Sequence, residues 1–592
     1  MKKKVVRKHN NSGNCFVCGI NNPWGLKARF YELEDGTVAA LVTAQWEHQS
    51  YPQRVHGGVI TALLDETLGR AINVTEPDTW AVTGDISVRF KKPVPYDEPL
   101  LVTGRVTRNT RLIFESEGAL YLKDGTLAAR RVKAFVNCGA YTTSALVMLD
   151  HSVYGLSGNY RNPNLLVDAY GIYTNTQFNG PYRALGCELF VYAVERNLDM
   201  AAERLGIDKY EIRRRNVLHL GDVDGHGQVV TSNGSAEALE AAAKYIKFNE
   251  PARPAEGPWR FGKGLALGNK FTAYGHTGTE ANVIIQHDDT IEVHVSHVEM
   301  GQGSMTVDCQ HVAEFFKVPM SSIRIRNENS DFMPYDEGTY CSRGTYINGN
   351  AIILACKDAK RQILERASTR MGVDKDGLET EGYKIYEKAN PEHFIYFHDL
   401  YEGGGWAPEG KLVGKGVFMP EQALNNPRNA QGNPVLFYSI GGWGMEVGVN
   451  IETGEVKLMQ AGGFYDAGRV INRKTCEGQI EGALSMGLGQ AVFEEIMIND
   501  KGKVINGNYR DYKVPTFMDN PNNEHVKVDF VGEPFATGPN GAKGIGEVAM
   551  IPVMAAVANA INAAAGAEIH NIPMTRERVL QALRDKEAAD KK

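Results

Sequence analysis

The chain has 592 residues, of which 43% are hydrophobic and 23% are charged, and its formal net charge is −7. This is the composition of an ordinary folded protein, and the length suffices for several domains. The charge balance offers no basic surface for nucleic acid. The basic start, Met1 to Lys8, is not followed by the apolar segment of a signal peptide. We therefore expect a cytoplasmic protein that binds neither nucleic acid nor membrane.

The eight cysteines are scattered along the chain. Only Cys15 and Cys18 lie close together, and one CxxC pair without a second pair is weak evidence for zinc. No segment has the cysteine spacing of a plant-type iron–sulfur centre. We interpret the pair as structural or incidental and predict no metal bound directly by side chains. Electrons taken up by this chain would have to pass to another polypeptide.

The first 125 residues have the pattern of a small α+β unit. Strands are predicted at 37–43, 86–90, 100–106 and 113–122, where apolar and β-branched residues recur. One helix is predicted between them, over 59–72. Its apolar residues at helical spacing are Ile60, Leu63, Leu64, Thr67, Leu68 and Ala71. A single helix among antiparallel strands is typical of an α+β fold.

The triplet His56-Gly57-Gly58 introduces this helix. Free backbone N–H groups at a helix start attract negative charge, and glycines let a ligand come close. Asp65 follows two turns later and is suited to activate water or to attack an acyl carbon. The alternative is that Asp65 and Glu66 are only the polar side of an amphipathic helix, and the pattern alone does not choose between them.

These residues resemble the hotdog-fold thioesterases of the phenylacetate-degradation type. The resemblance implies a hotdog domain over residues 1–125, paired with a second copy in a homo-oligomer, with acyl-CoA in the groove between them. It also implies that His56, Gly57, Gly58 and Asp65 are catalytic. The matching segments are Cys15–Gly19, Asn22–Pro23, Gly25–Leu26, His56–Ile60, Leu64–Glu66 and Pro93–Pro95.

The rest of the chain carries several glycine-rich turns. Such turns expose backbone N–H groups, which suits a phosphate-bearing ligand, although any one of them is also an ordinary turn. Their order along the chain is more specific than any single turn. They are Gly180–Gly186, Met300–Gly303, Tyr340–Thr345, Gly478–Gly482 and Gly538–Glu547.

The last turn crowds four glycines around one glutamate, Glu547. The apolar run Val548 to Ala565 follows, and Pro552 and Gly566 suit the start and the end of a helix. A carboxylate at this junction would be poorly solvated, which suits a general base. The alternative is a plain loop glutamate before a helix. The run is rich in alanine and interrupted by proline, so we predict a buried helix and no membrane span.

In this order the turns resemble the xanthine dehydrogenase and aldehyde oxidase family of molybdopterin-dependent hydroxylases, from about Asp124 to Leu583. The resemblance implies that Glu547 is the base beside molybdenum and that Arg183 faces a small-molecule substrate, an aldehyde or N-heterocycle. It implies molybdopterin in a dinucleotide form, with iron–sulfur and FAD centres on partner subunits. The implied cofactor-binding residues are Gly301, Gln302, Gly303, Ser342, Arg343, Gly344, Thr345, Gln479, Lys543, Gly544 and Gly546.

The resemblance has gaps. Ala184, Cys187 and Glu188 depart from the usual residues of the family, which leaves the substrate class open. Members begin with a hammerhead-like domain and a first half of the cofactor domain, where this chain carries the hotdog. The seam is expected near residues 123–126, and the strand over 127–136 suits either side. We predict a hotdog domain at 1–125, a remnant of the first mixed α/β molybdopterin-binding domain at 126–240 and the second at 241–592.

Three functions are consistent with these patterns. The first is a molybdenum hydroxylase fused to an acyl-CoA thioesterase-like domain. The second is a thioesterase whose C-terminal part is an inactive remnant. The third is a scaffold without catalysis that uses both folds for dimerisation.

Overall fold

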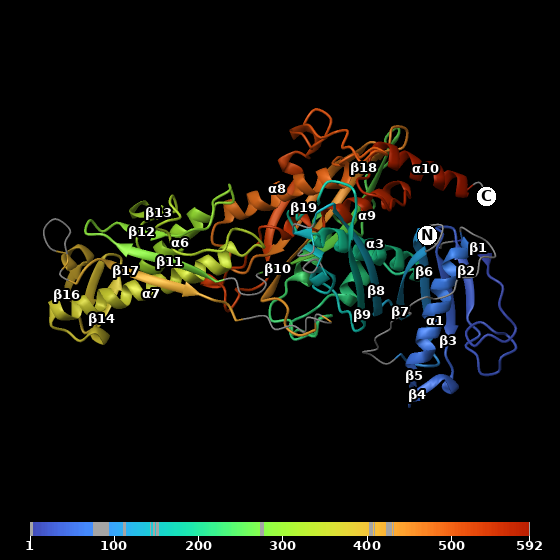
Figure 1. The fold of residues 1–592 in the computed structure, drawn as a ribbon, viewed down its shortest axis with the longest axis horizontal. Coiled ribbons are helices and arrows are strands. Elements are labelled where there is room, and N and C mark those ends of the chain that lie inside the picture. The colour runs from blue at the N-terminus through green and yellow to red at the C-terminus, as the bar shows by residue number, and fades with distance from the viewer. Residues whose placement is uncertain are drawn as a thin grey trace.

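A computed structural model describes residues 4–74, 94–109, 114–122, 124–141, 144–145, 148–149, 153–272, 278–401, 407, 409–421, 429 and 431–590. We refer to the described residues of 4–122 as the N-terminal part and to those of 124–590 as the C-terminal part. The molecule is elongated, with the N-terminal part at one end and a lobe of residues from about 280 to 418 at the other (Figure 1). A central body that contains the last helices lies between them.

The N-terminal part contributes most strands of a seven-stranded sheet, with helix α1 (Gly57–Gly69) lying against β3, β6 and β7. The helix and the strands predicted at 37–43, 100–106 and 113–122 are confirmed, while the strand predicted at 86–90 lies outside the described residues. A short pair, β4 (Gln49–Tyr51) and β5 (Arg54–Val55), precedes α1. In sheet order the strands are β1 (Val5–Lys8), β2 (Arg29–Leu33), β3 (Val38–Thr43), β6 (Pro99–Asn109), β7 (Phe114–Leu122), β8 (Leu127–Gly139) and β9 (Leu165–Tyr173).

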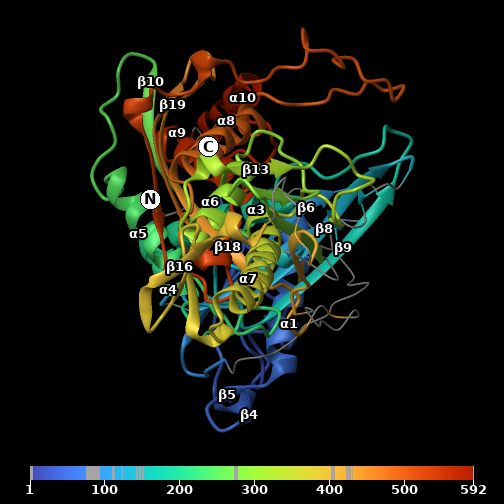
Figure 2. The same ribbon diagram turned by 90° about the vertical axis from the view of Figure 1, so that its left-hand side faces the viewer.

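Strand β8 joins the two parts. It pairs antiparallel with β7, where Arg130 lies opposite Ala119, and parallel with β9, where Arg130 lies opposite Leu165. The strand that the sequence left unassigned therefore belongs to both sides of the seam. The ion pair between Arg204 and Asp35, 2.7 Å apart and almost fully buried, ties the C-terminal part to the β2–β3 turn. Figure 1 shows β6, β7, β8 and β9 in this order, and Figure 2 shows β8 and β9 side by side.

The central body is a four-stranded sheet, β10-β18-β19-β20, with helices on both faces. On β18, Trp443 donates a hydrogen bond to the carbonyl of Ala549, just before α9, while the next residue, Gly444, faces α5. Because successive strand residues point to opposite faces, α9 and α5 cover opposite sides. The elements are β10 (Trp259–Thr272), β18 (Phe437–Asn450), β19 (Val456–Asp466), β20 (Val526–Val531), α3 (Cys187–Leu205), α4 (Lys209–Asn216), α5 (Ser235–Tyr245), α8 (Arg473–Val492), α9 (Val553–Ala565) and α10 (Arg576–Asp590).

The lobe at the far end has a four-stranded sheet, β13-β12-β11-β17, and a three-stranded sheet, β14-β15-β16. The long helix α7 lies against β11 and β17, and α6 packs against α7. The elements are α6 (Ser304–Phe316), α7 (Gly344–Met371), β11 (Thr279–Ile285), β12 (Ile291–His294), β13 (Ile323–Arg326), β14 (Leu378–Glu381), β15 (Lys384–Glu387), β16 (Asn390–Tyr396) and β17 (Leu412–Phe418).

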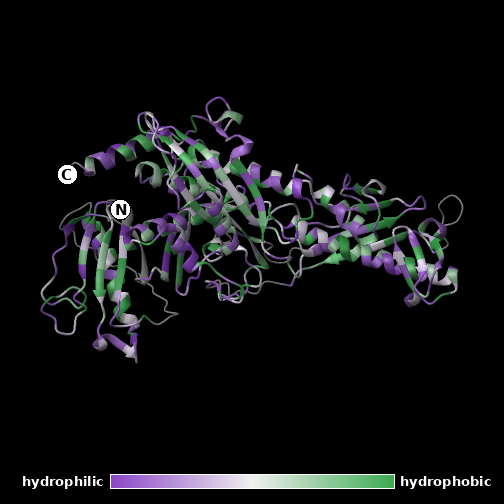
Figure 3. Cartoon of the chain, turned by 180° about the vertical axis from the view of Figure 1, so that it is seen from behind, coloured by the Kyte–Doolittle hydropathy of each residue, from purple (hydrophilic) through white to green (hydrophobic). Residues whose placement is uncertain are grey.

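The apolar run Val548 to Ala565 is the one described segment apolar and long enough to cross a membrane, and 78% of it is buried. Its first residues, Val548–Met550, form a 3₁₀ turn, and α9 begins at Val553 and ends before Gly566. Hydrophobic residues lie in the central body, in the N-terminal strands and in the far lobe, while α10 is largely hydrophilic (Figure 3). The run therefore packs as a core helix, as the sequence predicts.

Three sequence predictions need correction. The segment Gly478–Gly482 lies inside helix α8 and is not a turn, because its neighbours favour a helix strongly enough to accommodate isolated glycines. The boundary predicted at residue 240 falls inside α5, which packs against β18 and β19 and so cannot be divided. Gly344 and Thr345 likewise form the first turn of α7, directly after the predicted loop.

Candidate functional site

Three groups from distant parts of the chain contact the Glu547 carboxylate. The backbone N–H of Ala184 donates to Oε1 at 3.3 Å, and the hydroxyl of Ser342 donates to Oε2 at 3.0 Å. The ammonium of Lys270, on β10, lies 3.5 Å from Oε2. The glutamate side chain is 15% exposed and Lys270 is fully buried. The carboxylate is thus held in one orientation with a narrow face open to solvent.

Lys270 changes the electrostatics expected of this site. Burial on its own lowers the pKa of Lys270, but the Glu547 carboxylate raises it, and the net direction is upward. The lysine is therefore a permanent cation, which also donates to the carbonyl of Phe271 at 3.0 Å. Glu547 is not the isolated, poorly solvated carboxylate that the glycine pattern predicts, because it has a buried counter-ion.

The two loops that touch Glu547 have an unusual backbone. Ala184 and Leu185 in one loop, and Cys341 and Ser342 in the other, have positive φ values of 88°, 59°, 50° and 52°. Non-glycine residues reach this region at a cost of about 1–3 kcal/mol each and cluster at functional sites. A Cβ atom at Gly544 would lie 1.8 Å from the carbonyl oxygen of Ser342. Glycine is thus required for the Glu547 loop to approach the second loop.

Arg183 lies beside the same loop, but its guanidinium is engaged by the protein. Nε donates to the carbonyl of Gly546 at 2.7 Å, and Nη2 donates to the side-chain oxygen of Gln479 at 3.2 Å. The structure brings these three predicted residues together. Arg183 holds the loop that carries Glu547, rather than presenting free donors to a substrate.

The Met300–Gly303 loop is also satisfied within the protein. The carboxylate of Glu299 accepts hydrogen bonds from the N–H groups of Gly301 at 2.8 Å and Gly303 at 2.9 Å. The side-chain amide of Gln302 folds back to the carbonyl of Val298 at 2.9 Å. The sequence predicts that these N–H groups are open to a phosphate, whereas in the structure Glu299 occupies them.

Arg343 and Lys543 are buried in ion pairs. The guanidinium of Arg343 lies 3.1 Å from the carboxylate of Asp336, and the ammonium of Lys543 lies 2.6 Å from that of Asp466. All four side chains are almost completely inaccessible to solvent. These two predicted cofactor-binding residues therefore stabilise the loops that contain them through buried ion pairs. A buried charge that has a protein partner is not available to a ligand without breaking that pair.

A second carboxylate, Glu188, lies in the first turn of α3. It is 3% exposed, and its Oε2 atom has no hydrogen-bond partner among the described residues. Burial raises the pKa of Glu188 to about 7, and the negative charge of Glu547 adds to the shift. The site thus contains one carboxylate with a counter-ion and another that titrates near neutrality.

In the N-terminal part, His56 caps helix α1. Its Nδ1 atom accepts a hydrogen bond from the N–H of Gly58 at 3.0 Å. This corrects the prediction that the Gly58 N–H is free at the helix start to attract negative charge, because the N-cap side chain satisfies it. His56 itself is exposed and Gly57 is half-buried. Asp65 is half-buried two turns further along α1, as the helical periodicity predicts.

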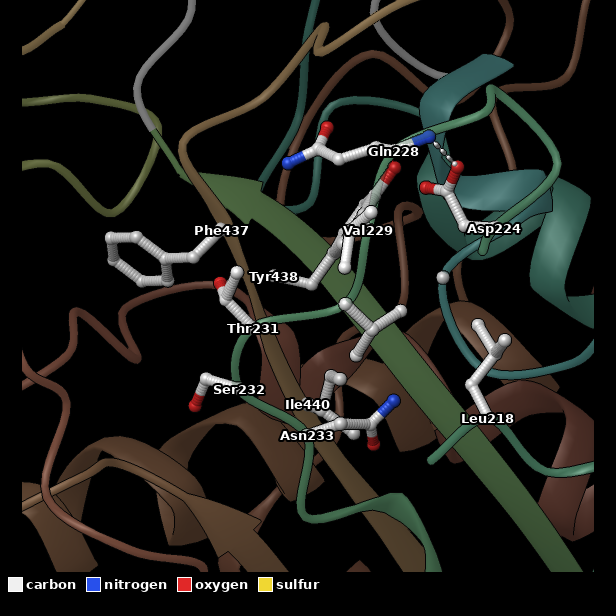
Figure 4. Close-up of a pocket in the computed structure, with 12 residues that line it drawn as sticks. Leu218, Asp224, Gln228, Val229, Thr231, Ser232, Asn233, Phe437, Tyr438 and Ile440 are labelled. Carbon is white, nitrogen blue, oxygen red and sulfur yellow. Dashed lines mark hydrogen bonds between the residues drawn. The ribbon is translucent and has the colours of Figure 1, made fainter. Parts of the chain in front are cut away.

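The cavities of the described residues differ in size and place. The one in Figure 4, between Gln228, Asp224 and Tyr438, has about 20 Å³, which is room for one water molecule. A cavity of about 640 Å³ borders the start of the Glu547 loop at Ala536 and Thr537. The second has the size of a small-ligand site, whereas the first does not.

With this geometry established, comparison with known proteins identifies the two parts. Residues 115–217 and 238–521 match the molybdopterin cofactor-binding domain families, and residues 53–129 match the thioesterase superfamily. This chain joins a thioesterase-superfamily region to molybdopterin-binding domains of the xanthine dehydrogenase and aldehyde oxidoreductase family. The matches overlap at 115–129, the stretch in which β7 and β8 join the two folds.

Individual relatives agree with this assignment. The xanthine dehydrogenase molybdenum-binding subunit of Escherichia coli O157:H7 is 31% identical over 489 residues, 80% of this chain and 62% of that protein. The aldehyde oxidoreductase molybdenum-binding subunit PaoC of Escherichia coli K12 is 28% identical over 408 residues, 68% and 52% of the two chains. The crystal structure of quinoline 2-oxidoreductase from Pseudomonas putida 86 shares the fold, with a TM-score of 0.70, 24% identity and coverage of 80% and 62%. The chain thus spans less than two thirds of the length of these proteins.

Three residues near the molybdopterin-domain motifs were missed by sequence reasoning. Lys270 had a signal, since it is the one charged residue of the segment Gly264–Thr272 in strand β10. Glu299 directly precedes the Met300–Gly303 loop, where an acidic residue suits the N-terminus of α6. Glu188 was noted only as a departure from the family.

Proposed function

We propose that the C-terminal part binds molybdopterin beside Glu547 and oxidises an aldehyde or an N-heterocycle with this glutamate as the general base. One observation carries the proposal: three separate segments contact the Glu547 carboxylate. They are strand β10, the Ala184 loop and the Ser342 turn. Their contacts hold Glu547 with one face open, which suits proton transfer at a fixed position.

The surroundings of Glu547 fit the base side of such a centre. When bound, molybdopterin with molybdenum would supply the two-electron oxidation, with oxygen derived from water. The chain's own contribution is to place the Lys270 ammonium beside the Glu547 carboxylate and to orient that carboxylate through Ser342. For the Met300–Gly303 loop to hold a pterin phosphate, Glu299 would have to leave the N–H groups that it now occupies.

We also propose that electrons leave through partner subunits that carry iron–sulfur and flavin centres. Several relatives are named as subunits of larger enzymes. Within the described residues, the one cluster of three metal-binding side chains contains two cysteines, too few to hold an iron–sulfur cluster by four thiolates.

A second activity, acyl-CoA hydrolysis, is favoured by the thioesterase match over 53–129 and by the position of Asp65. The carboxylate lies on α1, half-exposed, where it can act on water near a bound thioester. The helix start contributes the N–H of Gly57, since His56 already binds the N–H of Gly58.

A crossed experiment tests both activities. Glu547→Gln and Asp65→Asn each keep the size of the side chain and remove its basic oxygen. Each variant is assayed for oxidation of aldehydes and N-heterocycles with an artificial electron acceptor, and for thiol release from acyl-CoA. We expect each change to reduce only its own reaction, by about 10²–10⁴-fold, with molybdenum content unchanged.

The crossed design makes each variant the control for the other. Near-native oxidation by Glu547→Gln at the same molybdenum content as the parent would refute its role as the base. Equal thioesterase rates for Asp65→Asn and the parent would refute the role of Asp65. Absence of both activities and of the cofactor in the parent would instead favour the scaffold.

A further inference from the structure

A group of metal-binding side chains lies in the N-terminal part, away from Glu547. The Sγ atoms of Cys15 and Cys18 and a carboxylate oxygen of Glu66 all lie within 4.8 Å of one another. No other set of three such groups is found among the residues that the structure describes. We propose that Cys15, Cys18 and Glu66 bind a divalent metal ion of the zinc class. The sequence predicts no metal here because Glu66 is brought to the cysteines only by the fold.

The loop that carries the cysteines is shaped around one sulfur atom. Sγ of Cys15 accepts hydrogen bonds from the N–H groups of Val17 at 3.3 Å and Cys18 at 3.4 Å. The N–H of Gly19 donates to the carbonyl of Cys15 at 2.9 Å, and a Cβ atom on Gly19 would lie 2.3 Å from that carbonyl oxygen. Two N–H donors directed at one sulfur suit a thiolate, which is the form that binds metals.

The third ligand comes from α1. Glu66 is half-buried on this helix, and Arg70, one turn later, donates from Nε to the Glu66 carboxylate at 2.8 Å. Another nitrogen of Arg70 donates to Sγ of Cys18 at 3.3 Å. Two thiolates and a carboxylate carry three negative charges, so a doubly charged cation together with Arg70 neutralises the group. A buried arginine that orients two ligands is the kind of outer-shell contact that metal sites use.

The spacing of the ligand atoms fits zinc. A tetrahedral zinc ion with bonds of about 2.0–2.3 Å keeps its ligand atoms about 3.5–3.8 Å apart. The three atoms, within 4.8 Å of one another, need to approach by about 1 Å at most. Thiolates select soft or borderline ions over magnesium and calcium. Since Cys15 and Glu66 are half-buried, solvent can reach a fourth coordination position.

The proposed site would connect two parts of the N-terminal domain. The loop over residues 11–28 precedes β2, and Glu66 directly follows Asp65 on α1. A metal ion would fix this loop against the helix that carries Asp65. The site is a structural clamp in this proposal, and it does not depend on the reaction of either part.

The full-length chain, purified under reducing conditions and freed of metal with a chelator, is titrated with Zn²⁺ and separately with Co²⁺. We expect one zinc ion per chain, counted apart from molybdenum by mass spectrometry, and the visible and sulfur-to-metal bands of tetrahedral thiolate-bound cobalt. The double variant Cys15→Ser/Cys18→Ser should lose this metal, and Glu66→Gln should bind it more weakly. Cys309→Ser, a half-buried cysteine in another domain, is the matched control and should keep the metal.

Circular dichroism of each variant shows whether it is folded. If the double cysteine variant does not fold, the weaker metal binding expected of Glu66→Gln still tests the proposal. Failure of the reduced, folded parent to bind Zn²⁺ or Co²⁺ would overturn the proposal. Equal binding by the parent and by folded Cys15→Ser/Cys18→Ser would also overturn it. So would a Cys15–Cys18 disulfide in the fresh protein whose reduction does not restore metal binding.

Discussion

Buried charges near the molybdopterin-domain motifs are compensated by specific partners. Lys270 faces Glu547, Lys543 faces Asp466, and Arg343 faces Asp336. The first two pairs connect segments that are far apart in the chain, and the third connects residues seven positions apart. Removing one member would leave the other charge buried without compensation, which typically costs several kcal/mol. Glu188 differs from these residues, since desolvation dominates its environment.

The raised pKa of Glu188 predicts that the free energy of unfolding depends on pH. Its pKa of about 7 in the folded chain lies above the ordinary value of 4.5, so folding takes up a proton between these values. Below pH 4.5 the carboxyl of Glu188 is neutral in the folded chain, and its contribution to the free energy of unfolding is complete. This contribution is lost as the pH rises through about 7, where the buried group becomes charged. From about pH 4.5 to pH 7, the parent should lose roughly 3 kcal/mol of unfolding free energy relative to Glu188→Gln.

Denaturant unfolding across this pH range measures the difference. Glu240→Gln, an exposed glutamate on α5, is the control and should show no comparable trend. Parallel stability profiles for the parent and Glu188→Gln would contradict the prediction.

At the scale of elements, glycines let two helices pack directly on strands. A Cβ atom at Gly264 of β10 would lie 2.2 Å from the carbonyl of Ala556 in α9. The same relation holds at Gly416 of β17, where a Cβ atom would lie 1.9 Å from the carbonyl of Ala351 in α7. The alanine-rich surface of α9 and the glycines of β10 thus form one close contact. This contact positions β10, and therefore Lys270, against the loop before α9.

Gly264→Ala should disrupt this contact. The added methyl group meets backbone atoms that cannot rotate away, so we expect a loss of about 3 kcal/mol or more of unfolding free energy. The control is Gly482→Ala in α8, where a Cβ atom meets nothing within 4 Å. That change should stabilise the helix by up to about 1 kcal/mol. Thermal unfolding of both variants decides the matter, and a Gly264→Ala variant as stable as the parent would refute the packing.

At the scale of the whole molecule, the edge strand β9 of the shared sheet carries exposed apolar residues. Tyr170 and Ile172 are two residues apart, so they share one face of the strand, and Phe135 of β8 stacks on Tyr170 with 5.2 Å between ring centroids. Tyr173, at the end of β9, is exposed as well. Phe178, just after the strand, is also exposed. Exposed apolar residues that gather on one strand of a folded protein are typical of an interaction surface. We propose that a partner subunit covers this surface, in line with our proposal that electrons leave through such subunits.

The chain purified alone should therefore self-associate and contain less than one molybdenum per chain. The double variant Tyr170→Lys/Ile172→Lys should be more monomeric by light scattering, because the charges oppose burial of this face. Val417→Lys, at an exposed residue of β17 in the far lobe, should leave association unchanged. A monodisperse parent with one molybdenum per chain would contradict this prediction.

Much of the local structure could be predicted from the sequence. Apolar periodicity located α1 and the strands at 37–43, 100–106 and 113–122, and Gly566 marked the end of α9. The segment Gly478–Gly482 was misread, because glycine spacing does not distinguish a turn from a helix that accommodates glycines. The roles assigned to Arg343 and Lys543 assumed that a charge in a motif faces a ligand, whereas each faces a buried carboxylate.

The sequence by itself determined the two-part organisation and the placement of Glu547 between a glycine loop and a buried helix. These features depend on short-range spacing, which one segment contains in full. Only the tertiary structure decided that Lys270 neutralises Glu547, that Glu66 joins Cys15 and Cys18, and that β8 serves both folds. Such contacts form only when helices and strands pack against one another. The residues involved are far apart along the chain, so no local pattern in the sequence indicates that they will meet.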